Sequence, residues 1–150
     1  MSTLRAKVSD LLSGARLVSV TRLHYSWAFE FDRVGLTTST SWRIVRSGRL
    51  LLTSNDDGQK FGLPQPVDSE AQFQATLAGH QVTSCGVAPA TADLTLDFDE
   101  GTRFEILSTS IGYEAWQLNS AGSCIVAGNE GRLSEATYAV PQVMIGGPWE

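Results

Sequence analysis

Seven side chains carry the groups in this chain that are best suited to chemistry or binding: Arg43, Asp56, Asp57, Gln59, Tyr113, Glu114 and Trp116. Two carboxylates can perform acid–base chemistry when one is buried and its pKa rises. Adjacent residues on an extended chain, however, point to opposite faces. Asp56 and Asp57 therefore need a partner from elsewhere, for example Glu114. The polar cluster at 55–59 predicts a hydrogen-bonding turn more directly than a catalytic pair.

Other reactive groups stand apart from one another. His24 and His80 have no second ligand at metal-binding spacing, and Cys85 and Cys124 lack a paired ligand motif. The acidic stretch 97–100 lacks the alternating oxygen ligands that calcium requires. There is no glycine-rich phosphate loop and no serine in a nucleophile elbow. We therefore expect no metal and no cofactor, and the sequence favours a non-enzymatic protein.

Composition predicts one soluble domain over residues 1–150, because 42% of the residues are apolar and 18% are charged. No apolar run approaches the roughly 18 residues of a membrane-spanning helix. The N-terminus lacks the apolar region of a secretory signal, and two unpaired thiols are typical of a reducing compartment. We therefore expect a cytoplasmic protein that does not enter a membrane.

Charge is distributed unevenly along the chain. Residues 1–75 have nine basic and seven acidic side chains, a net +2, whereas residues 76–150 have two and nine, a net −7. An acidic chain lacks the concentrated basic face that nucleic-acid binding needs. The asymmetry favours a protein partner with a basic surface, or head-to-tail self-association.

The clearest structural pattern is a hairpin over residues 93–106. Leu94, Leu96 and Phe98 alternate with polar residues, and Phe104 and Ile106 do so after the turn at 100–101. Apolar periodicity also predicts helices over about 3–13 and from Ser69 to 79, the second opened by a capping box of Ser69 and Gln72. Strands are expected at 16–23, 27–31, 36–45 and 50–53.

The two halves of the sequence resemble each other in order. The strand at 16–20 corresponds to 81–85, 29–32 to 96–99, 41–44 to 115–118, and 50–52 to 124–126. We predict a mainly β (α+β) fold. It is a tandem pseudo-twofold repeat of a short helix and a four-stranded antiparallel meander, packed as one barrel-like or sandwich domain. Repeat one covers about 3–58, a linker 59–67, repeat two about 68–131 and a C-terminal tail 132–150.

Trp42 and Trp116 are equivalent under this comparison, so the shared fold accounts for an aromatic residue at both positions. Features present in one copy are better candidates for binding. They are Arg43, Arg46 and Arg49 in the first copy and the Tyr113-Glu114 pair in the second. The tail lies over the domain, covers an edge strand, or reaches a second subunit to form a homodimer.

Four segments, 41–45, 55–64, 93–106 and 112–118, together resemble a family of small bacterial proteins, frequent in actinobacteria, that is catalogued as a domain of unknown function. The resemblance covers about residues 12–131. It implies a bacterial, cytoplasmic origin and brings no catalytic residues with it.

The leading hypothesis is a non-enzymatic binding or interaction module, in its sharpest form immunity-like or regulatory, that acts through the acidic second half. The alternative is a small-molecule binder or enzyme with its site between the repeats, using Arg43, Asp56, Asp57 and Glu114. A third hypothesis is an oligomerising protein held together by the tail.

Overall fold

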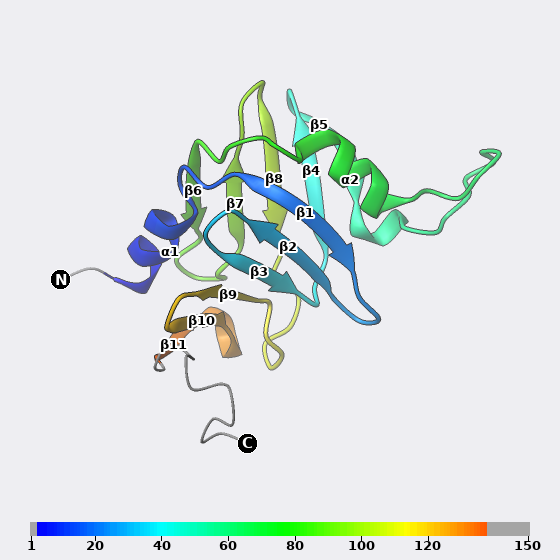
Figure 1. The fold of residues 1–150 in the computed structure, drawn as a ribbon. Helices are drawn as coiled ribbons and strands as arrows, with labels where there is room; N and C mark the ends of the chain where they lie inside the picture. The colour runs from blue at the N-terminus through cyan, green and yellow to red at the C-terminus, as the bar shows by residue number, and fades with distance from the viewer. Residues whose placement is uncertain (1–2, 138–150) are drawn as a thin grey trace, which may run out of the picture.

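The computed structural model describes residues 3–137, which form two antiparallel sheets and two helices (Figure 1). The first sheet has the strand order β1 (Leu17–Arg22), β2 (Trp27–Phe31), β3 (Gly35–Thr38), β9 (Trp116–Ser120), β10 (Ser123–Ala127) and β11 (Leu133–Thr137). The second has the order β5 (Arg49–Thr53), β4 (Trp42–Arg46), β8 (Thr102–Ile106), β7 (Leu94–Asp97) and β6 (Ser84–Val87). Short 3₁₀ turns, η1 (Ser54–Asp56) and η2 (Asn129–Gly131), follow β5 and β10.

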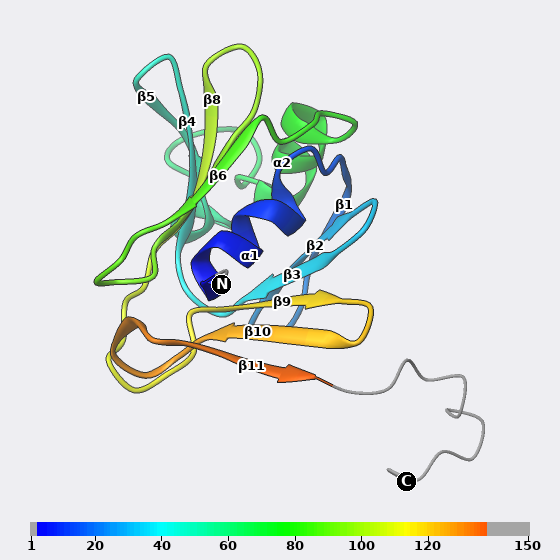
Figure 2. The same ribbon diagram turned by 90° about the vertical axis from the view of Figure 1, so that its left-hand side faces the viewer.

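The predicted mainly β class is confirmed, and the sheets are arranged as a sandwich that does not close into a barrel (Figure 2). Alternate side chains of each sheet point inward, as the period of a β-strand requires. Buried side chains from both sheets and both helices form a single hydrophobic cluster. At its centre Phe29, Trp42, Phe73 and Phe104 pack ring against ring, with centroids 4.8–6.0 Å apart.

The hairpin predicted at 93–106 is confirmed. Its strands are β7 and β8, paired in register from Leu94 with Ile106 to Asp97 with Arg103. Leu94, Leu96, Phe98, Phe104 and Ile106 are all buried. The turn uses left-handed backbone at 100 and 101, with φ values of 59° and 69°.

The prediction of one strand over 36–45 was wrong. The chain leaves the first sheet after Thr38 and enters the second at Trp42, so two short strands replace one long one. The reason is local: the Thr38 hydroxyl accepts a bond from the backbone N–H of Thr40 and donates to the carbonyl of Ala115. These bonds bend the backbone out of its ladder. Residues 16–53 consequently form five strands divided between the two sheets, and not a four-stranded meander.

Helix α1 (Leu4–Leu12) and helix α2 (Ser69–Leu77) cover the two open sides of the sandwich. Helix α1 packs on β6 and β11, and α2 packs on β1 and β5 (Figures 1 and 2). Both helices agree with the predicted positions. The predicted capping box is wrong, because the side chain of Asp68 accepts from the Ala71 N–H as the N-cap. Ser69 is instead buried and donates its hydroxyl to the carbonyl of Thr53.

The segments that follow the two helices lie side by side. Gly14 N–H donates to Val82 O and Gly79 N–H donates to Leu17 O, each at 2.8 Å. Two side-chain hydrogen bonds join the same two segments. The Gln81 amide donates to the carbonyl of Gly14, and the Arg16 guanidinium donates to the carbonyl of Gly79. These crossed bonds connect the start of β1 to the segment before β6.

The tail predicted at 132–150 divides into two parts. Residues 133–137 form β11, an edge strand that pairs along the whole of β10, so this part covers a strand edge, one of the expected alternatives. Glu135 of β11 pairs with Lys7 of α1 and accepts from the hydroxyl of Ser123 at 2.6 Å. The remaining tail residues, and with them the predicted dimer contact, lie outside the described residues. Between residues 3 and 137, no helix has both the length and the apolar character needed to cross a membrane.

Candidate functional site

The chain passes between the two sheets at two places, residues 39–41 and 107–115, and these crossovers meet at one end of the sandwich. The hydroxyl of Thr38 donates to the carbonyl of Ala115 at 2.5 Å, and the N–H of Leu107 donates to the carbonyl of Ser41 at 3.0 Å. Side chains from both crossovers face the space between them. We call this space the crossover cleft.

Three adjoining cavities make up the crossover cleft, of about 180, 270 and 560 Å³. Their walls are hydroxyl-rich, with Ser39, Thr40, Thr109 and Ser110 contributing to the largest. Glu114 lines two of the three cavities and is the one charged side chain among the lining residues. The cleft therefore offers many neutral hydrogen-bonding groups and a single carboxylate.

Two aromatic side chains stand exposed at the crossover cleft. Tyr25 is 83% exposed and Tyr113 is 81% exposed. The backbone that carries Tyr113 is held in place, because the Ser110 hydroxyl accepts from the N–H groups of Gly112 and Tyr113 at 3.1 Å. Glu114 is oriented by Gln117, whose side-chain amide donates to Oε1 at 2.7 Å.

Trp116 forms the floor of the cleft and is not itself available for stacking. Its ring is 1% exposed, and its indole N–H donates to the carbonyl of Ala92 at 2.8 Å. Trp42 is equally buried. The prediction that these two aromatic residues serve the core is therefore confirmed.

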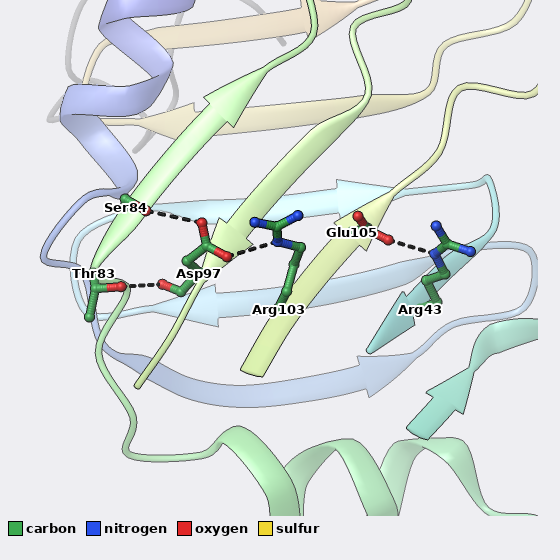
Figure 3. A network of polar contacts seen from close by, with 6 residues as sticks. All are labelled: Arg43, Thr83, Ser84, Asp97, Arg103 and Glu105. Atoms are coloured by element: carbon green, nitrogen blue, oxygen red, sulfur yellow. Dashed lines mark hydrogen bonds and ion pairs between the residues drawn. The ribbon is translucent and has the colours of Figure 1, made fainter. Parts of the chain in front are cut away.

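Arg43 lies on a different surface, the outer face of the second sheet (Figure 3). Its Nε donates to Glu105 Oε1 across β4 and β8 at 2.5 Å. One row further along, Arg103 Nε donates to Asp97 Oδ1 at 2.8 Å, and the Ser84 hydroxyl donates to Oδ2 of the same carboxylate. We call these side chains the charge ladder. The hydrogen bond that Arg103 donates to Asp97, and then the negative charge of that carboxylate, raise the pKa of Arg103.

Asp57 belongs to a third place, the turn after β5. Its carboxylate accepts from the N–H of Ser69 at 2.9 Å and pairs with Arg22 Nε at 3.1 Å. Asp56 contributes to the turn through its backbone. Its N–H donates to the Thr53 hydroxyl at the start of η1, and its carbonyl accepts from the N–H of Gln59. The expected hydrogen-bonding turn is thus present. A cavity of about 550 Å³ opens beside Arg22 and Asp57.

The isolated histidines and cysteines do not assemble into a site. His24 is exposed, and His80 Nδ1 lies 3.0 Å from Asp99 Oδ1 at the surface. Both cysteines are free thiols. Burial raises the pKa of Cys85 to about 12, so its thiol stays protonated at neutral pH. No group of three or more metal-ligating side chains occurs in the part of the chain that the structure describes.

Comparison with known families agrees with the extent of the two sheets. A family model described as "Family of unknown function (DUF6188)" matches residues 14–137. The chain belongs to this family. No curated protein and no solved structure matches it. The matched region of DUF6188 begins after α1 and ends with β11, so it contains the crossover cleft and the charge ladder.

Of the site residues predicted from the sequence, Tyr113, Glu114 and Trp116 meet at the crossover cleft of this DUF6188 domain. Arg43, Asp57 and Gln59 lie elsewhere, and Asp56 lies one residue beyond the cleft-lining Asn55. Sequence reasoning missed the cleft hydroxyl groups at 39–41, 109 and 110. The available signal was a run of small polar residues, Thr37 to Ser41, which begins inside β3 and continues past its end, and which we interpreted as strand throughout.

Proposed function

We propose that this protein is a binding module that takes a protein partner at the crossover cleft. The observation that carries the proposal is the pair of tyrosines Tyr25 and Tyr113, each more than four-fifths exposed. Tyr113 lines the cavity of about 560 Å³, and Tyr25 lines the adjoining cavity of about 270 Å³. Exposed aromatic side chains beside a pocket are typical of the residues that dominate binding energy in protein interfaces.

The partner we propose presents a basic side chain to Glu114. This carboxylate is exposed, is held by Gln117, and has no cation within ion-pairing distance among the described residues. An arginine or lysine entering the cleft would find Glu114 at its wall and hydroxyl groups around it. Hydrogen bonds to a charged partner are roughly twice as strong as neutral ones.

The charge ladder is the weaker candidate for a basic partner. Asp97 and Glu105 are already paired with Arg103 and Arg43, so a partner would have to compete with internal cations. Asp97, Glu105 and Glu114 all belong to the acidic half of the chain. We place the proposed contact at Glu114 because its carboxylate is the one of the three without an internal cation within residues 3–137.

We further infer that the chain is a tandem duplication of a helix and five strands. Two observations support this. The first sheet contains the order β1-β2-β3-β9-β10, and the second has the order β6-β7-β8-β4-β5. Exchanging β1 to β5 with β6 to β10, each for the strand of the same rank, converts one order into the other. The backbone bonds between Gly14 and Val82 and between Gly79 and Leu17 interconvert in the same way. Under this duplication the crossover cleft lies between equivalent loops of the two copies, where pockets commonly form.

The bacterial, cytoplasmic setting implied by the family resemblance agrees with the two free thiols. In that setting a module that holds a basic partner fits an immunity-like or regulatory role. We also retain the homodimer formed through the C-terminal tail, residues 132–150, as a proposal. Light scattering of a chain that ends at residue 137, and so keeps β11, tests the part of the tail beyond that strand.

Co-purification from the source cells tests the proposed site. Tagged wild-type protein is expected to retain a partner, such as the product of a neighbouring gene, that Glu114→Gln and Tyr113→Ser lose. Asp97→Asn, a matched change on the charge ladder, is expected to retain it. If wild type and both cleft variants retain the partner equally, the crossover cleft is not the binding site. If only Asp97→Asn loses the partner, the partner binds at the charge ladder.

A neutral, hydroxyl-rich small molecule is the second candidate for the crossover cleft. The lining hydroxyls of Ser39, Thr40 and Thr109 favour such a ligand, and Tyr113 offers a ring face beside them. Titration with a panel of neutral sugars, followed by NMR shifts of the 107–115 amides, tests this reading. Shifts confined to those amides would support it.

A further inference from the structure

Residues 58–67 form an arm that extends away from the sheets beside α2 (Figure 1). Two backbone bonds close its base, from Gly58 N–H to Val67 O and from Val67 N–H to Gln59 O, each at 2.8 Å. Its outer part closes with a bond from Leu63 N–H to Lys60 O at 2.7 Å. The arm is thus an ordered turn with its own hydrogen bonds.

The tip of the arm presents apolar side chains to solvent. Phe61 is 67% exposed and Leu63 is 50% exposed, and neither belongs to the hydrophobic cluster of the core. Phe61 has φ 47° and Gly62 has φ 76°, so two consecutive residues adopt left-handed backbone. This conformation is unfavourable for a residue with a side chain such as phenylalanine. A strained backbone that holds an apolar ring in water indicates a binding element.

A matching cavity of about 430 Å³ lies between the β6–β7 connection, the 107–115 crossover and η2. Its wall includes Ala90 and the exposed Ile111, with Glu130 at the edge. The cavity therefore offers an apolar surface and one carboxylate.

We propose that the arm of one molecule docks into this cavity of a second copy of the same chain. Phe61 enters the cavity beside Ile111, and Lys60 pairs with Glu130. The arm does not reach its own cavity, because it lies across the sheets from the β6–β7 connection (Figure 1). The net +2 of residues 1–75 and the net −7 of residues 76–150 favour such a head-to-tail contact.

The contact joins two different surfaces, so each molecule donates one arm and receives one. Such heterologous contacts form a ring if the rotation closes, and a chain if it does not. A single arm buries far less area than the standard interface of about 1,600 Å². We therefore expect weak, salt-sensitive association.

Sedimentation of the purified full chain over a wide concentration range tests the contact. Wild type is expected to gain mass as its concentration rises. Phe61→Asn is expected to lose this gain in mass, because asparagine tolerates left-handed backbone and only the ring is lost. The cavity variant Ile111→Ser with Glu130→Asn is expected to lose it too, because it lacks the apolar side chain and the carboxylate that receive the arm. Leu50→Asn, which changes another exposed apolar side chain, is expected to associate like wild type.

Mixing the two deficient variants gives the decisive result. One keeps an intact cavity and the other an intact arm, so together they are expected to form a 1:1 pair and nothing larger. Unfolding curves that match wild type show that each variant folds. A wild type that remains monomeric throughout overturns the proposal, as does Phe61→Asn protein that associates like wild type, or a mixture that forms no pair.

Discussion

The indole N–H of Trp116 donates to the carbonyl of Ala92 at 2.8 Å, whereas the indole N–H of Trp42 is buried without an acceptor among residues 3–137. The two rings occupy corresponding places at the start of β9 and β4, and each is 1% exposed. Trp42 is enclosed by rings, with the centroids of Trp27 and Phe73 5.0 and 5.1 Å away. The two rings thus match in their place on the strand and in their burial, and they differ in one hydrogen bond.

Trp116→Phe is expected to destabilise the protein by about 1–2 kcal/mol more than Trp42→Phe. Both changes remove the same volume from the core. Only the first leaves a carbonyl, that of Ala92, without its donor. Urea unfolding of the two variants measures the difference, and equal losses would show that the Trp116 hydrogen bond adds nothing net to stability.

The Asp97–Arg103 pair of the charge ladder is expected to contribute roughly 0.2–1 kcal/mol, the range measured for solvent-exposed ion pairs. The side chains of Asp97 and Arg103 are 35% and 50% exposed, so water and salt screen their attraction. A double-mutant cycle with Asp97→Asn and Arg103→Gln, run at low and high salt, isolates the pair. A coupling that persists unchanged at high salt would contradict this description.

Much of the fold follows from local patterns in the sequence. The hairpin at 93–106 was predicted because its apolar residues alternate without exception from Leu94 to Phe98. The two helices were predicted because their buried residues, such as Val8 and Leu12, recur at helical spacing. These elements depend on residues that are neighbours along the chain.

The crossover cleft was beyond local reasoning. The segment Thr37 to Ser41 suits a strand at every position, and its bend depends on the carbonyl of Ala115, 77 residues away from Thr38. The same limit applies to the cap of α2. Asp68 and Ser69 both suit an N-cap, and Ser69 is excluded because it bonds to Asp57 and Thr53, which lie in an earlier strand and turn.

Gly131→Ala is expected to destabilise the protein strongly, by about 2–4 kcal/mol. A Cβ at this position would lie 2.6 Å from the carbonyl oxygen of Ala90, and φ is 73°. Gly58→Ala separates the two effects, because φ is 83° there and no atom lies within 4 Å of the added Cβ. Gly58→Ala is expected to cost about 1–2 kcal/mol, from backbone strain alone.

Thermal and urea unfolding compare these two glycine variants. The additional stability lost in Gly131→Ala, relative to Gly58→Ala, measures the clash with the β6–β7 connection. That connection also forms a wall of the cavity of about 430 Å³ beside Ile111. If the two variants lose equal stability, the connection shifts freely and the close approach at Ala90 is not a constraint.

Glu135 makes the docking of β11 against α1 dependent on pH. Hydrogen bonds from Lys7 and then Ser123 lower the pKa of this carboxyl below its usual value. A group whose pKa is lower in the folded state stabilises the protein above its unfolded pKa, about 4.3 for glutamate. That stabilisation is lost as the pH falls through the lower, folded value.

The difference in urea midpoint between wild type and Glu135→Gln is therefore expected to be largest near neutral pH and to shrink below pH ~4. Ser123→Ala removes the second donor and leaves Lys7. Its urea midpoint near neutral pH is expected to lie between those of wild type and Glu135→Gln. Because other carboxyls titrate in all three proteins, the differences report on Glu135 while the individual curves do not. A gap that stays constant from neutral to acidic pH would mean that Glu135 acts through packing and not through its charge.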